Sequence, residues 1–158
     1  MKIMSDGEYK EVWDRFDALF HFWPSCSDGE EPFVFNMSYT AYKLTEYWNE
    51  EQEAIVNDIF MQMSPSDIYA LDYQHDCFIF NPGEEIAAER KWPGWHDAER
   101  DCQVYFPSYY PDGDYHFFAS KDFSYGMLGH PWKGVIYVFG NRLAELFERN
   151  RDSLGLDG

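Results

Sequence analysis

Apolar residues recur at steps of three and four in three stretches of the chain, which is the spacing of one helix face. The first stretch begins at a Ser5–Glu8 capping box and is ended by Pro24. The second covers residues 49–63 and opens on acidic residues, which the positive end of a helix dipole favours. The third begins at Gly140. Each stretch is therefore expected to form an amphipathic helix.

Short runs of β-branched and aromatic residues between these stretches predict strands. The runs cover residues 33–35, 68–71, 77–80, 104–106, 115–118 and 135–139. Residues 68–71 and 77–80 are close enough in sequence to form a hairpin, whereas residues 83–100 are expected to be irregular and residues 126–129 to form a glycine-rich turn. Strands interspersed with helices in a chain of 158 residues predict one α+β domain, mainly antiparallel sheet packed with two or three helices.

The net charge is strongly negative and unevenly distributed. The chain has 29 acidic and 12 basic residues, a formal charge of -17. Residues 1–89 contain 19 acidic and 4 basic residues, and residues 90–158 contain 10 and 8, so 15 of the 17 excess negative charges lie in the first half. The second half is near-neutral and rich in aromatic residues. This charge argues against binding to nucleic acid or to an anionic membrane surface, because both attract basic residues.

The acidic half suggests a partner protein with a basic surface. We predict that the partner-binding residues are Asp28, Glu30, Glu31, Glu46, Glu50, Glu51, Glu53 and Asp58. A surface of this kind suits an inhibitor or immunity-type protein that caps a cationic effector such as a nuclease toxin, because carboxylates can occupy a phosphate-binding groove. The alternative interpretation is a solvated face that only maintains solubility.

Motifs for catalysis are missing from the sequence, so no enzymatic activity, cofactor or metal site is predicted. There is no Gly-x-Ser-x-Gly, no His-Glu-x-x-His and no glycine-rich phosphate loop. The three cysteines are far apart, and no secretion signal or long apolar segment is present, which predicts a reduced, cytoplasmic protein. The alternative function is a small-molecule-binding domain or an unrecognised enzyme, with a pocket formed by His116, Asp122, His130 and Trp132.

Motifs in the second half resemble those of a known family. They are Tyr110-Pro-Asp-Gly-Asp-Tyr-His-Phe-Phe118, Gly129-His-Pro-Trp132 and Val138-Phe-Gly140. Their order resembles a bacterial family of uncharacterised proteins, the domain of unknown function numbered 2716, over roughly residues 105–146. The resemblance implies a small bacterial cytoplasmic domain. It transfers no activity and no residue role, because the family is uncharacterised.

Overall fold

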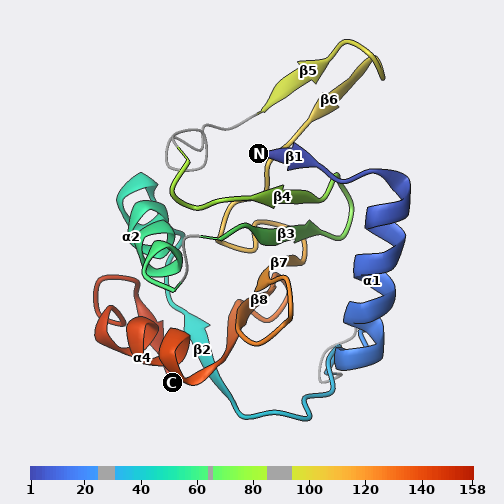
Figure 1. Ribbon diagram of the computed structural model, residues 1–158. Coiled ribbons are helices and arrows are strands. Elements are labelled where there is room, and N and C mark those ends of the chain that lie inside the picture. The colour runs from blue at the N-terminus through green and yellow to red at the C-terminus, as the bar shows by residue number, and fades with distance from the viewer. Residues whose placement is uncertain (25–30, 64–65, 85–93) are drawn as a thin grey trace.

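An eight-stranded antiparallel sheet forms the centre of the computed structural model, which describes residues 1–24, 31–63, 66–84 and 94–158 (Figure 1). The strand order is β1-β4-β3-β7-β8-β9-β2-β10, and neighbouring strands run antiparallel throughout. The strands are β1 (Lys2–Ile3), β2 (Tyr39–Leu44), β3 (Ile68–Asp72), β4 (Phe78–Phe80), β7 (His116–Ser120), β8 (Gly126–His130), β9 (Val135–Phe139) and β10 (Leu156–Asp157). A separate hairpin consists of β5 (Trp95–Asp97) and β6 (Cys102–Val104).

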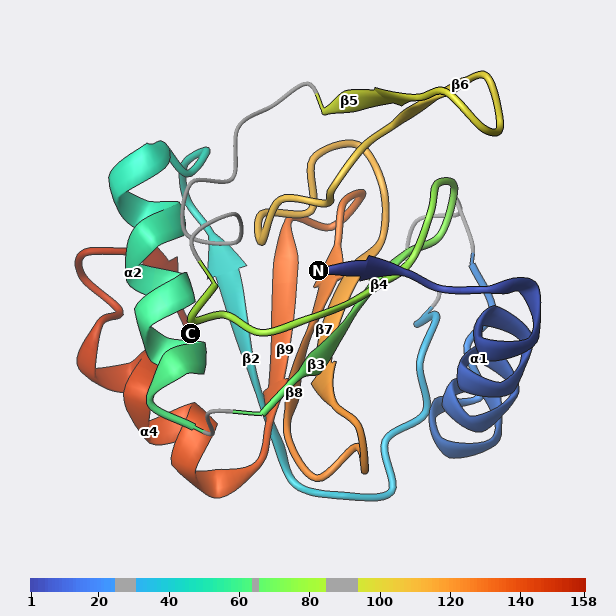
Figure 2. The same ribbon diagram turned by 45° about the horizontal axis from the view of Figure 1, so that its top comes forward.

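Three helices cover the two faces of the sheet in the described residues. Helix α1 (Asp6–Phe20) lies on one face, and α2 (Glu50–Met61) and α4 (Asn141–Arg149) lie on the other (Figure 2). Capping boxes start the first two, at Ser5 and at Asn49. The predicted α+β class, with a mainly antiparallel sheet and two or three helices, is therefore confirmed. Across the described ranges, no helix has both the length and the apolar character needed to cross a membrane.

Both faces of the central strands are buried, because successive strand residues point to opposite faces and each face is covered. Toward α1, the rings of Phe16 and Phe117 stack with centroids 4.7 Å apart. Toward α2 and α4, Phe118 packs with Phe60 and Phe147 in a second cluster of buried side chains. The sheet thus separates two hydrophobic cores.

Several strand predictions need correction. Residues 33–35 form no strand; the Phe33 side chain is buried in the α1-side core although its backbone is irregular. In the run at residues 104–106, the strand β6 ends at Val104. Residues 126–129 belong to strand β8 and not to a turn. A Cβ on Gly126 would lie 2.7 Å from the Phe118 carbonyl oxygen, so glycine is needed there for close packing within the sheet.

Candidate functional site

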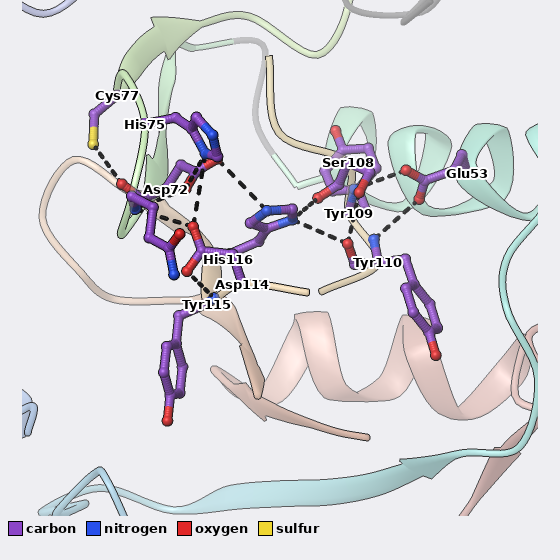
Figure 3. A network of polar contacts seen from close by, with 11 residues as sticks. Glu53, Asp72, His75, Cys77, Ser108, Tyr109, Tyr110, Asp114, Tyr115 and His116 are labelled. Carbon is purple, nitrogen blue, oxygen red and sulfur yellow. Dashed lines mark hydrogen bonds and ion pairs between the residues drawn. The ribbon is translucent and has the colours of Figure 1, made fainter. Parts of the chain in front are cut away.

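Two buried aspartates and a buried histidine meet at one end of the sheet (Figure 3). Asp72 is the last residue of β3 and pairs in register with His116, the first residue of β7. Asp114 lies in the turn that leads into β7. Their side chains are only 3%, 6% and 7% exposed for Asp72, Asp114 and His116. One ligand atom from each lies within 4.8 Å of the others, so the sheet pairing assembles a compact polar cluster.

Backbone carbonyls fix the orientation of the His116 ring. Its Nδ1 lies 2.9 Å from the Ser108 carbonyl oxygen and 3.0 Å from that of Tyr110. Because a carbonyl oxygen only accepts hydrogen bonds, Nδ1 carries the ring proton. The other nitrogen, Nε2, faces Asp72 Oδ2 at 3.6 Å. The ring of His116 thus directs Nε2 toward the carboxylates.

Glu53 of α2 holds the loop that supplies these carbonyls. The backbone N–H groups of Tyr109 and Tyr110 donate to its two carboxylate oxygens at 2.8 and 3.3 Å. The Tyr109 hydroxyl donates to Asn57 Oδ1, also on α2, at 2.8 Å. Glu53 thus acts inside the fold, between α2 and the loop beside His116, although its sequence position suggests an outward-facing acid (Figure 3).

The two carboxylates share one backbone donor. The Gln74 N–H lies 3.0 Å from Asp72 Oδ1 and 3.0 Å from Asp114 Oδ2, and the Tyr115 N–H donates to Asp114 Oδ1 at 2.8 Å. His75 closes the outer side of the cluster with a side chain that is 43% exposed. Its Nδ1 lies 3.1 Å from Asp72 Oδ2 and 3.8 Å from Asp114 Oδ2.

The cluster concentrates negative charge in a buried place. Within the described residues, the ion-pair partners of Asp72 and Asp114 are histidines, and no lysine or arginine pairs with either carboxylate. Burial, together with the neighbouring Asp114, raises the pKa of Asp72 to about 8. Without a cation, the pair therefore retains a proton at neutral pH.

The predicted partner-binding acids divide into separate groups in the structure. Asp28 and Glu30 lie outside the described residues. Glu31 accepts a hydrogen bond from the Tyr137 hydroxyl and pairs with Lys133 at 2.8 Å. Glu31, like Glu53, is therefore committed to contacts within the chain.

The remaining predicted acids lie together in sequence on or just before α2. Glu46, Glu50, Glu51 and Asp58 are exposed, and in the described part of the chain none of them forms an ion pair. Glu46 Oε1 accepts a hydrogen bond from Gln52 Nε2 at 2.8 Å. Tyr47, in the segment that leads into α2, is 76% exposed. We call Glu46, Glu50, Glu51 and Asp58 the α2 acidic surface.

The structure does not bring the four predicted pocket residues together. His116 faces the α2 side of the sheet, and its partner on β8 is Gly129. His130 is the next residue of β8 and therefore faces the α1 side, where its ring centroid lies 5.1 Å from that of Tyr115. Asp122 is in the turn at the opposite end of the β7–β8 hairpin. Trp132 is 59% exposed. Burial lowers the pKa of His130, which keeps its ring neutral.

Asp72, Asp114 and His75 are not among the predicted site residues. For Asp72 the sequence contains one local signal. The residue directly follows the apolar run of residues 68–71, and a carboxylate at the end of a buried strand needs a partner. For Asp114 the signal is its distance from His116. The two residues are two positions apart at the start of a predicted strand, which places both side chains on one face. Their meeting with Asp72 depends on the pairing of β3 with β7.

Comparison with known proteins places the chain in a family. The family described as "Protein of unknown function (DUF2716)" matches residues 3–144, so the chain belongs to this family and the resemblance of its motifs is confirmed. A curated relative is the uncharacterized protein YxiI of Bacillus subtilis (strain 168), which is 38% identical over 85 residues. The aligned region covers 52% of this chain and 44% of YxiI, so the chain spans less than half the length of that relative. No solved structure matches.

Proposed function

We propose that this chain is a non-enzymatic domain that binds a basic protein through the α2 acidic surface. The supporting observation is that four exposed acids on one helix and its leading segment are not neutralised within the described chain. On α1, Glu8 and Asp14 are paired with Lys2 and Lys10, and Glu11 and Asp17 are exposed acids for which the described residues provide no ion pair. The negative potential of the α2 acidic surface is thus available to a partner.

The geometry of this surface suits cationic side chains. Glu50 and Glu51 lie in the first turn of α2, where the helix holds their backbone fixed. Tyr47 adds an exposed ring, which attracts arginine and lysine by cation–π contact and contributes buried area in an interface. Acids of this kind accelerate association, and an aromatic contact slows dissociation.

The specific form of the proposal is an inhibitor or immunity-type protein. A nuclease toxin needs a basic groove for its phosphate substrate, and a set of carboxylates on a helix is opposite to that groove in charge. Occupying the groove excludes nucleic acid, so inhibition needs no catalytic group on the inhibitor. The partner is thereby defined by its chemistry, as a protein with a concentrated basic surface.

The test compares two neutralised variants of equal charge. E50Q/E51Q removes two acids of the α2 acidic surface, and E11Q/D17N removes two exposed acids of α1. Each protein is used to capture partners from a lysate of the source organism at low and at high salt, and the captured basic protein is then purified for kinetics. We expect wild type and E11Q/D17N to retain the same basic protein and E50Q/E51Q to lose it.

Association kinetics distinguish electrostatic steering of the partner from non-specific binding. The association rate should fall on the order of ten-fold or more between low and high salt for wild type, and less for E50Q/E51Q. An unchanged affinity in E50Q/E51Q, or equal losses in both variants, would show that the α2 acidic surface is not the binding site. Inhibition of the partner's nuclease activity tests the specific form of the proposal.

A further inference from the structure

We propose that Asp72, Asp114 and His116, with His75 as the outer ligand, form a binding site for a single zinc ion. This site lies at the end of β3 and β7 and does not depend on the α2 acidic surface. It offers two carboxylates and two imidazoles from two short segments of the chain, residues 72–75 and 114–116. The inference goes beyond the proposed function, since it concerns a metal and not a protein partner.

Three separations between candidate ligand atoms are close to those of a zinc coordination shell. Tetrahedral zinc with bonds of about 2.0 Å places its ligand atoms roughly 3.3 Å apart. Asp72 Oδ2 lies 3.1 Å from His75 Nδ1 and 3.6 Å from His116 Nε2. Asp114 Oδ2 lies 3.8 Å from His75 Nδ1. The two longer separations exceed hydrogen-bond length and are close to the edge of that tetrahedron.

The surroundings of the ligands are those of a metal site. A ligating histidine needs its second ring nitrogen held by an acceptor, and the Ser108 and Tyr110 carbonyls hold His116 Nδ1 in this way. The carboxylates are oriented in turn by the Gln74 and Tyr115 N–H groups. These contacts leave His116 Nε2 directed at Asp72. The ligands are thus positioned before a metal arrives.

Electrostatics favours a cation at this point. Two carboxylates with side-chain exposures of 3% and 6% lie together, and in the described chain only histidines pair with them. A dication at this point compensates the charges of both carboxylates when both are ionised, which lowers the cost of burying them. His75, at 43% exposure, gives the ion a route from solvent.

The ligand chemistry selects zinc over the common hard cations. Calcium takes six to eight oxygen ligands, and magnesium prefers an octahedron of oxygens with several waters. Imidazole nitrogens combined with carboxylate oxygens suit zinc in four-coordinate geometry. Asp72, Asp114 and His116 supply three ligand atoms within 4.8 Å of one another, and His75 is the fourth ligand of the proposed site.

The experiment uses the full chain after metal removal with a chelator. Zinc chloride alone is added in calorimetry and in thermal unfolding, with magnesium and calcium chloride as comparisons. We expect one zinc per chain and a rise in Tm of about 5–10 °C when free zinc is about one hundred times its Kd. Magnesium and calcium should produce no comparable rise.

Two variants locate the ion. D114N removes one ligand charge but keeps an oxygen to accept the Tyr115 N–H, so it should fold with unchanged or higher metal-free Tm and lose zinc affinity at least about 100-fold. H96A is the matched control, because His96 is an exposed histidine paired with Asp101 outside the cluster. It should bind zinc as wild type does.

Three results would overturn the proposal. The first is a wild-type chain with no zinc-dependent rise in Tm and no heat of binding. The second is a folded D114N that retains wild-type zinc affinity, and the third is loss of binding in H96A. None of these results bears on capture of a basic protein by the α2 acidic surface, so the two proposals fail separately.

Discussion

Replacing Glu53 with alanine should destabilise the protein far more than replacing its neighbour Glu50. The Glu53 carboxylate receives the Tyr109 and Tyr110 N–H groups at 2.8 and 3.3 Å, and Tyr109 is completely buried. A hydrogen bond to a charged group contributes about 1.5–3 kcal/mol, and the longer of the two contributes less. E53A should therefore lower the free energy of unfolding by about 2–4 kcal/mol.

Glu50 provides the matched control, because it lies in the same first turn of α2 but is exposed. Both residues gain from the helix dipole, by about 0.3–1 kcal/mol each, so this contribution cancels between E50A and E53A. Their difference then reports the contacts of Glu53 with the loop.

Urea unfolding followed by circular dichroism measures the effect. With a slope of about 2 kcal/mol per molar urea, the midpoint of E53A should fall by about 1–2 M relative to E50A. E53Q keeps one accepting oxygen and should unfold between the two. If the free energies of unfolding of E53A and E50A differ by less than about 0.5 kcal/mol, the hydrogen bonds of Glu53 to the loop do not stabilise the fold as proposed.

Three further predictions concern other buried groups. F16A should cost about 3–5 kcal/mol in urea unfolding, because Phe16 is fully buried and stacks on Phe117 at 4.7 Å; a loss below about 1 kcal/mol would contradict this packing. Burial lowers the pKa of His130 from 6.5, so protonation favours the unfolded chain. Stability should consequently fall as the pH drops below 6.5, with a shallower slope in H130L; equal slopes would exclude His130 as the cause. Burial raises the pKa of the Cys77 thiol to about 12, so iodoacetamide should modify the half-buried Cys102 before Cys77. Mass spectrometry of the folded protein measures the order, and modification of Cys77 first would contradict the prediction.

Features encoded by neighbouring residues could be predicted from the sequence. The Ser5–Glu8 capping box starts α1, and the helix predicted from residue 49 starts at the Asn49 cap, because each cap is formed within one turn. The strand at residues 135–139 is a continuous β-branched and aromatic run. In these cases local propensity and tertiary packing favour the same structure.

Features that depend on distant residues could not be predicted in the same way. In the sequence, Glu31 is one of many acids in the acidic half. Its partners Lys133 and Tyr137 lie more than a hundred positions away, so its contacts could not be predicted. Asp72 and His116 meet only because β3 pairs with β7, and no sequence spacing reports that pairing. His116 and His130 lie on opposite faces of the sheet because side chains alternate along a strand. Predicting this arrangement requires the register of β7 and β8, which the sequence does not give.

The outermost strands of the sheet, β1 and β10, contain two residues each. Strand β1 pairs with two of the three residues of β4, and β10 pairs with two of the six residues of β2. Each therefore covers part of an edge that would otherwise be a template for pairing between molecules. Deleting residues 2–3 would uncover β4, and deleting residues 156–157 would uncover β2. Resistance to aggregation thus depends on two very short segments, and any tag or fusion partner joined near them needs a linker that leaves both strands paired.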